Sequence, residues 1–125
     1  MTTDFVLATI AIPGDATGIY LAYSTSTVMK PTYRGHKTMV NDQHTKVGVA
    51  TKSFLSRENE YMSTFQHEVA FVPLIALPVE QLSAFEGQLL LELRQRYPLS
   101  GSAREWFRTT ERQLIAELVW QLADA

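Results

Sequence analysis

The sequence predicts an α+β domain in which a small, mainly antiparallel β-sheet is flanked by helices. Short β-branched runs alternate with three stretches of helical periodicity, and the predicted elements follow in the order β-β-loop-β-α-β-α-α. A chain of 125 residues, 46% of them apolar, has the usual size of one domain with one hydrophobic core. We therefore expect residues 1–125 to form a single domain.

The first half of the chain is predicted to supply three strands and a long loop. Residues 4–12 and 18–23 are apolar runs separated by Pro13-Gly14-Asp15, which indicates a hairpin. Residues 24–45 show neither the helical nor the strand periodicity of apolar residues, which predicts a long loop that could carry a short β-ribbon. Residues 46–50 are a third, brief β-type run.

The second half is predicted to contain three helices and one strand. Ser53 is placed to cap a helix that ends near Phe65, and Pro78 to start a helix that continues to Arg96. Between them residues 68–77 predict a strand in which Pro73 requires an edge position or a bulge. The buried stripe of the first helix is expected to comprise Phe54, Leu55, Tyr61, Met62 and Phe65, and that of a last helix Leu114, Ile115, Leu118, Val119 and Leu122.

Charge is distributed unevenly along the chain. The formal net charge is -2, which argues against a protein that coats nucleic acid without specificity. Residues 30–57 nevertheless carry six basic side chains and one acidic one, whereas residues 58–125 carry five basic and ten acidic ones. The first half therefore offers a basic belt to a polyanionic partner.

Composition also excludes several classes of protein. The absence of cysteine rules out disulfides and Cys-containing metal sites. The apolar run at residues 5–12 is too short to cross a bilayer, so we expect a cytoplasmic protein without a membrane partner. The three histidines share no ligand spacing with one another, and solvated or hydrogen-bonded histidines are the commoner case.

Three single residues stand out, each with an ordinary alternative. Glu86 falls inside the apolar arc of the helix over 79–96, so its carboxylate must be paired, protonated or bound to metal. A structural ion pair to an arginine explains it equally well. Arg57 borders an apolar stripe and can simply lay its stem along the core, and Tyr20 on a strand can simply pack.

The order of these residues resembles the GIY-YIG nuclease family. Gly18-Ile19-Tyr20 on a strand is followed by Lys46-Val47-Gly48 on a second strand, by Arg57 with Tyr61 one helical turn later, and by Glu86 on a later helix. The stretch Arg104-Glu105-Trp106-Phe107 also looks like an element found late in several subgroups. The resemblance covers about residues 17–108. Each motif is weak alone, and their joint order is moderately specific.

The resemblance implies catalytic roles for five residues. Tyr20 would orient or deprotonate the attacking water, and Arg57 would hold the scissile phosphate. Glu86 would bind the single divalent metal of the family, Mg²⁺ or Mn²⁺. Tyr61 would contact phosphate or water. Lys46 replaces the tyrosine of the second motif, and its ammonium would neutralise phosphate.

The implied function is metal-dependent endonucleolytic cleavage of DNA. The inserted loop over residues 24–45 would embrace the substrate, and the residues expected to bind it are Lys30, Arg34, Lys37 and Lys52. The altered second motif leaves an alternative open, a catalytically degenerate module that binds nucleic acid or a protein partner. A small structural subunit that joins a larger assembly or a homo-oligomer is a third hypothesis.

Overall fold

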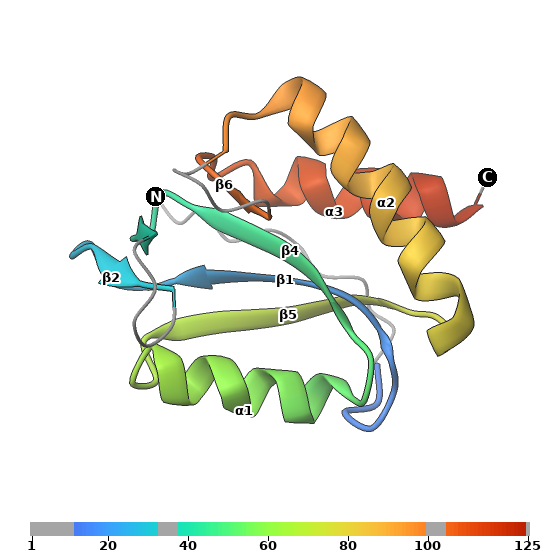
Figure 1. The fold of residues 1–125 in the computed structure, drawn as a ribbon, viewed down its shortest axis with the longest axis horizontal. Coiled ribbons are helices and arrows are strands. Elements are labelled where there is room, and N and C mark those ends of the chain that lie inside the picture. The colour runs from blue at the N-terminus through green and yellow to red at the C-terminus, as the bar shows by residue number, and fades with distance from the viewer. Residues whose placement is uncertain (1–11, 33–37, 100–104, 125) are drawn as a thin grey trace.

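The computed structural model describes residues 12–32, 38–99 and 105–124, which form an antiparallel sheet with helices on both faces (Figure 1). The α+β class predicted from the sequence is confirmed. Of the strand predicted over residues 4–12, residues 4–11 lie outside the described residues. The hairpin predicted between that strand and residues 18–23 is wrong, because residues 18–22 pair with two other strands, one along each edge. The strands are β1 (Gly18–Ser24), β2 (Lys30–Pro31), β3 (Met39–Val40), β4 (Thr45–Ala50), β5 (Val69–Ala76) and β6 (Trp106–Phe107), and the helices are α1 (Phe54–Thr64), α2 (Val79–Arg96) and α3 (Arg112–Asp124).

The main sheet has the order β5-β1-β4-β6, with β1 antiparallel to both of its neighbours. Tyr20 lies opposite Gly48 on β4 and opposite Pro73 on β5. The register with β5 shifts between Ile19 and Tyr20, so Pro73 occupies an irregular position on an edge strand, as predicted. No sequence pattern indicated β6, a two-residue strand at the opposite edge.

The two faces of the sheet carry different side chains. Because successive residues of a strand point to opposite faces, Ile19 and Leu21 face α2 and α3, whereas Tyr20 and Ala22 face α1. Among the described residues, α1 is the one helix on its face of the sheet, and α2 and α3 cross the other face (Figure 1). The core is therefore divided by the sheet into two layers.

Helix α1 begins as the sequence predicts. Ser53 is extended at the N-cap, and its hydroxyl accepts a hydrogen bond from the Ser56 amide at 3.0 Å. The predicted core residues Phe54, Tyr61 and Phe65 are buried.

Two predicted core residues are exposed instead. Leu55 is 56% exposed and Leu114 is 53% exposed. Each precedes or follows a buried residue by one position, which rotates it by about 100° around the helix and away from the sheet. The prediction of these two residues as core was wrong because they lie at the margin of their stripes.

The predicted loop over residues 24–45 carries the short ribbon that the sequence allowed. The irregular segment is shorter than predicted at both ends, because Ser24 belongs to β1 and Thr45 to β4. Strands β2 and β3 pair through Lys30 opposite Val40 and Pro31 opposite Met39. At the base of the ribbon the Asp42 amide donates to the Ser26 carbonyl at 2.9 Å.

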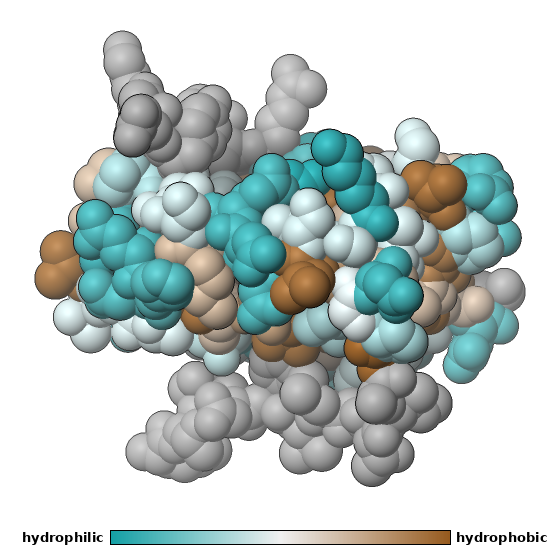
Figure 2. Space-filling model, turned by 90° about the horizontal axis from the view of Figure 1, so that it is seen from below, coloured by the Kyte–Doolittle hydropathy of each residue, from teal (hydrophilic) through white to brown (hydrophobic). Residues whose placement is uncertain are grey.

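The helices of the described segments include none with the length and apolar character needed to span a membrane. Seen from the side of α1, the coloured residues are mainly hydrophilic, and the hydrophobic ones are scattered among them (Figure 2).

Candidate active site at the β4 edge

The outer edge of β4 is only partly covered by β6. Strand β6 pairs with Thr45 and Lys46 at the start of β4, and the Val47 amide donates to the Glu105 carbonyl at 3.2 Å. Farther along the same edge, the Val49 carbonyl accepts a hydrogen bond from the Arg57 guanidinium at 3.4 Å. The backbone at this edge is thus held by side chains and by the segment that leads into β6.

Two glycines allow the close packing of strands and rings beside this edge. A Cβ added to Gly48 would lie 2.6 Å from the Tyr20 hydroxyl oxygen, and one added to Gly18 would lie 2.0 Å from the Ile75 carbonyl oxygen. Both positions therefore exclude a side chain. The glycines of the two sequence motifs thus have a structural role. Gly18 allows the close approach of β5, and Gly48 leaves space for the ring of Tyr20.

Tyr20 and Tyr61 form a buried hydroxyl pair. Their oxygens are 2.8 Å apart, and Tyr20 stacks on Phe71 with ring centroids 4.6 Å apart. Burial raises the pKa of Tyr20 well above its ordinary value and raises that of Tyr61 as well, although the nearby Arg57 charge acts in the opposite direction. Both phenols are therefore neutral near pH 7.

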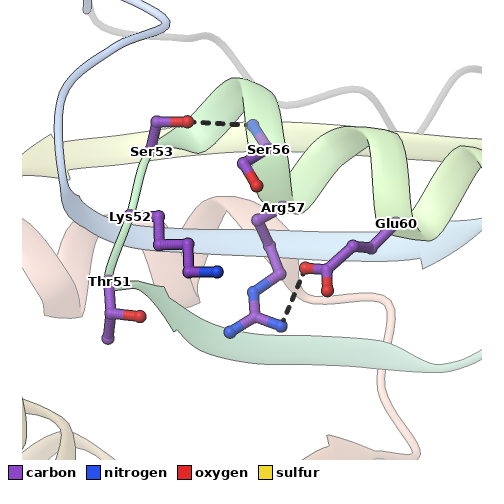
Figure 3. Close-up of a pocket in the computed structure, with 6 residues that line it drawn as sticks. All are labelled: Thr51, Lys52, Ser53, Ser56, Arg57 and Glu60. Carbon is purple, nitrogen blue, oxygen red and sulfur yellow. Dashed lines mark hydrogen bonds and ion pairs between the residues drawn. The ribbon is translucent and has the colours of Figure 1, made fainter.

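Arg57 projects from the second turn of α1 toward the sheet. Its guanidinium donates to Glu60 Oε1 at 3.1 Å as well as to the Val49 carbonyl. In Figure 3 its side chain lines a pocket together with Lys52, whose side chain extends toward it. The other residues that line this pocket are Thr51, Ser53, Ser56 and Glu60. The pocket therefore presents two cations, one carboxylate and several hydroxyls.

Glu86 approaches the same edge from α2, on the other side of the sheet. It is half-buried on the face of α2 that contains the buried Leu82, Leu89 and Leu93, as its position in the apolar arc predicts. Burial and then the charge of Glu105 raise the pKa of Glu86, while the charges of Lys46 and Arg57 lower it. The charges of these three groups therefore all act on the Glu86 carboxyl.

Lys46 is paired with a carboxylate for which the sequence predicted no role. Its ammonium lies 2.7 Å from Glu105 Oε2, and both side chains are partly buried. Glu105 stood out in the sequence only as part of the stretch that precedes β6. The available signal was its place in that motif, since no local periodicity connects it with Lys46.

The structure thus brings together all five residues expected to be catalytic. Tyr20 and Tyr61 share a hydrogen bond, and the charges of Arg57 and Glu105 act on both of them. Glu86 belongs to the same group because the charges of Lys46 and Arg57 lower its pKa.

The residues expected to bind substrate are more dispersed. Lys52 lines the pocket that Arg57 also lines. Lys30 lies on β2, where its ammonium forms an ion pair with Glu68 at 2.7 Å. Arg34 and Lys37 lie outside the described residues.

The donor set at this edge suits a hard cation. Glu86 offers carboxylate oxygens, and Mg²⁺ commonly takes one or two carboxylates and keeps several of its waters. The described residues include no group of three or more His, Cys, Asp or Glu side chains of the kind that would form an all-protein cage. Among these residues, Glu86 is the one that could hold such an ion through its carboxylate.

Comparison with protein-family models identifies the domain. The model of the T5orf172 domain matches residues 18–121, which is most of the chain. The chain belongs to the T5orf172 domain family. This family is generally regarded as having a GIY-YIG-like fold, which confirms the resemblance at the level of the fold. No curated protein and no solved structure matched in the corresponding searches.

The T5orf172 match begins at Gly18, the first residue of β1, and extends into α3. It therefore includes every residue of the candidate site. A nuclease activity is consistent with membership in this family.

Proposed function

We propose that this T5orf172 domain is a metal-dependent endonuclease of the GIY-YIG type that hydrolyses phosphodiester bonds in DNA. The observation that supports the proposal is the convergence of five side chains from four elements on one edge of the sheet. They are Tyr20 from β1, Lys46 from β4, Arg57 and Tyr61 from α1, and Glu86 from α2. The elements lie on both faces of the sheet, so this gathering is not a by-product of packing within one layer.

Arg57 is suited to hold the scissile phosphate. Its side chain is 35% exposed, and its guanidinium donates to Glu60 and to the Val49 carbonyl, so its remaining donors are held in a defined orientation. A guanidinium placed in this way binds two phosphate oxygens and stabilises the charge that develops on them.

Glu86 would hold Mg²⁺ or Mn²⁺ through its carboxylate. When bound, such an ion supplies positive charge that polarises the phosphoryl oxygen or lowers the pKa of a bound water. The Lys46 ammonium would add a positive charge near the same phosphate. It stands where the GIY-YIG pattern has the tyrosine of its second motif.

Tyr20 contributes through its neutral hydroxyl. Because burial raises the pKa of this phenol and Tyr61 already forms a hydrogen bond with it, a phenolate base is disfavoured near pH 7. The hydroxyl instead orients the attacking water, and Tyr61 fixes the direction of the Tyr20 hydroxyl.

The path of DNA across the protein follows the positive side chains. The pocket beside Arg57 has a volume of about 100 Å³, several times the roughly 10–15 Å³ that one water requires. With Lys52 on its wall, it is placed to receive a phosphate next to the scissile one. Lys30 on the ribbon, together with Arg34 and Lys37, would contact the strand farther along.

The proposal is tested by incubating the purified protein with labelled single- and double-stranded DNA in Mg²⁺, Mn²⁺ or EDTA. We expect product only with a divalent metal, and we expect it to disappear in Arg57→Ala. Glu92→Gln on the surface of α2 serves as the control, because its ion pair with Arg96 at 3.7 Å is exposed. Absence of product under every condition, with DNA still bound, contradicts the nuclease assignment.

One observation favours the alternative, a module that binds nucleic acid or a partner without cleaving. Tyr20 is 2% exposed, and its hydroxyl is enclosed by Tyr61 and Gly48. A nucleophilic water must reach this hydroxyl if Tyr20 is to orient it. Binding that is insensitive to metal, without cleavage, would select this alternative.

A further inference from the structure

The backbone of Glu105 is held beside β4. Its carbonyl accepts the hydrogen bond from Val47, and the next residue, Trp106, pairs with Lys46 and is buried in the α1 layer. The side chain of Glu105 therefore starts from a fixed point beside β4. Its position follows from the pairing of β6 with β4.

The ion pair of Glu105 with Lys46 differs from a surface pair. The two groups are 2.7 Å apart, with side-chain exposures of 33% and 19%, respectively. The Arg96–Glu92 pair on α2 is 3.7 Å long, with exposures of 53% and 39%. Solvent and salt screen a partly buried pair less than an exposed one, so Lys46 and Glu105 constrain each other more strongly.

The charge of Glu105 also reaches the other groups of the site. After the larger effect of burial, it contributes to raising the pKa of Tyr20, of Tyr61 and of Glu86. A carboxylate that acts on all three lies within the site rather than at its periphery.

We propose that Glu105 is a positioning residue that holds the Lys46 ammonium in place for the substrate phosphate. A lysine has a flexible four-carbon stem, so an unanchored ammonium samples many positions. Pairing with Glu105 uses one of the three N–H donors of Lys46 and leaves two for phosphate oxygens. This inference rests on the proposed nuclease function for its catalytic consequence, while the contact itself is open to a separate test.

A double-mutant cycle tests the catalytic consequence. Glu105→Gln keeps the size of the side chain and removes its charge, and Lys46→Met removes the ammonium. We expect Glu105→Gln to lower the single-turnover rate at saturating DNA by about tenfold, with DNA affinity in EDTA changed by less than about twofold. In the Lys46→Met background the same change has no further effect, because Glu105 acts through Lys46. Glu92→Gln is the matched control.

Two results would overturn the inference. Rate losses that multiply in the double mutant would mean that Glu105 acts independently of Lys46. A loss of Mg²⁺ affinity in Glu105→Gln, measured by calorimetry with Mg²⁺ alone, would make Glu105 a metal ligand instead.

A readout that needs no activity separates this inference from the proposed function. The ¹⁵N-labelled ammonium of Lys46 is expected to give a protected NMR signal in the wild type, which broadens in Glu105→Ala and persists in Glu92→Gln. A signal that is unaffected by Glu105→Ala contradicts the contact. A wild-type protein that shows the signal and cleaves no DNA would refute the nuclease proposal and leave the ion pair established.

Discussion

The two layers on either side of the sheet are built from different chemistry. The buried layer under α2 and α3 is mainly aliphatic, with Ile19, Leu21 and Val47 facing the leucines of α2. The layer under α1 is aromatic, and Tyr20 and Tyr61 bring hydroxyls into it. Since β1 supplies both layers by simple alternation, one strand contributes aliphatic side chains to the core on one face and the Tyr20 hydroxyl to the other.

The difference between the two layers shows how a small domain can fix polar groups in position next to its hydrophobic core. Aliphatic side chains pack closely and have no directional requirement. Tyr20, Tyr61 and Phe71 stack and tilt against one another, with centroid distances of 4.6 to 5.9 Å, which fixes the phenol oxygens as well as the rings. The aromatic layer thus places hydroxyls where an aliphatic one would only exclude water.

The largest expected effect on stability comes from the aliphatic layer. Ile115 on α3 is 1% exposed, so Ile115→Ala leaves a cavity and should lower the free energy of unfolding by about 2–5 kcal/mol. Urea unfolding measures this loss. The cleavage rate per folded molecule should stay unchanged. A large loss of rate in the folded variant would show that the two layers are not separable.

The largest effects on rate are expected from the aromatic layer and the helix that covers it. Arg57→Ala removes charge stabilisation at the phosphate, and Tyr20→Phe removes the hydroxyl that orients water. Each should lower the single-turnover rate by about 10²-fold or more, with little change in DNA affinity for Tyr20→Phe. Rates equal to wild type in both variants would place any activity elsewhere in the chain.

Sequence patterns were sufficient where the signal is local. Helix α1 followed from its cap at Ser53 and the spacing of Phe54, Tyr61 and Phe65. The edge position and irregular register of β5 were the two alternatives that Pro73 predicted, and both are present. The half-buried position of Glu86 followed from the helical arc in which it falls.

The rest depends on partners that are distant in sequence. Strand β6 has two residues and exists only because Trp106 and Phe107 pair with β4. The ion pair of Glu105 with Lys46 joins segments whose patterns give no indication of each other. The exposure of Leu55 and Leu114 depends on how each helix is rotated about its axis against the sheet. The sequence does not determine this rotation for residues at the margin of an apolar stripe.

The salt dependence of DNA binding should report the basic residues of the inserted segment, residues 24–45, separately from the site. Neutralising Lys30, Arg34 and Lys37 together should flatten the dependence of log affinity on log salt, by about 0.9 for each phosphate no longer neutralised on duplex DNA and about 0.7 on a single strand. Glu86→Gln should leave the slope nearly unchanged. A fluorescence-anisotropy salt series is the measurement, and a slope equal to wild type in the triple variant would remove the inserted segment from the DNA-binding surface.

A smaller effect concerns stability and pH in the absence of metal. Burial and the charge of Glu105 raise the pKa of Glu86, so the folded protein binds this proton more tightly than the unfolded chain does. The stabilising contribution is full below the unfolded pKa and is lost as pH rises through the folded pKa. Glu86→Gln should therefore be more stable than wild type at neutral pH, and the gain should vanish below about pH 4. Urea unfolding at several pH values measures it, and a constant difference would contradict the assigned environment.

We expect Glu86 to hold the metal ion beside the tyrosines of the aromatic layer. The nuclease proposal depends on this role of Glu86. The decisive experiment is the single-turnover cleavage of labelled DNA over a range of Mg²⁺ concentrations, in wild type and in Glu86→Gln. We predict that product rises with Mg²⁺ in the wild type and is absent at every concentration in Glu86→Gln, although both proteins bind DNA equally in EDTA. Equal cleavage by the two proteins would contradict the role of Glu86 as the metal ligand.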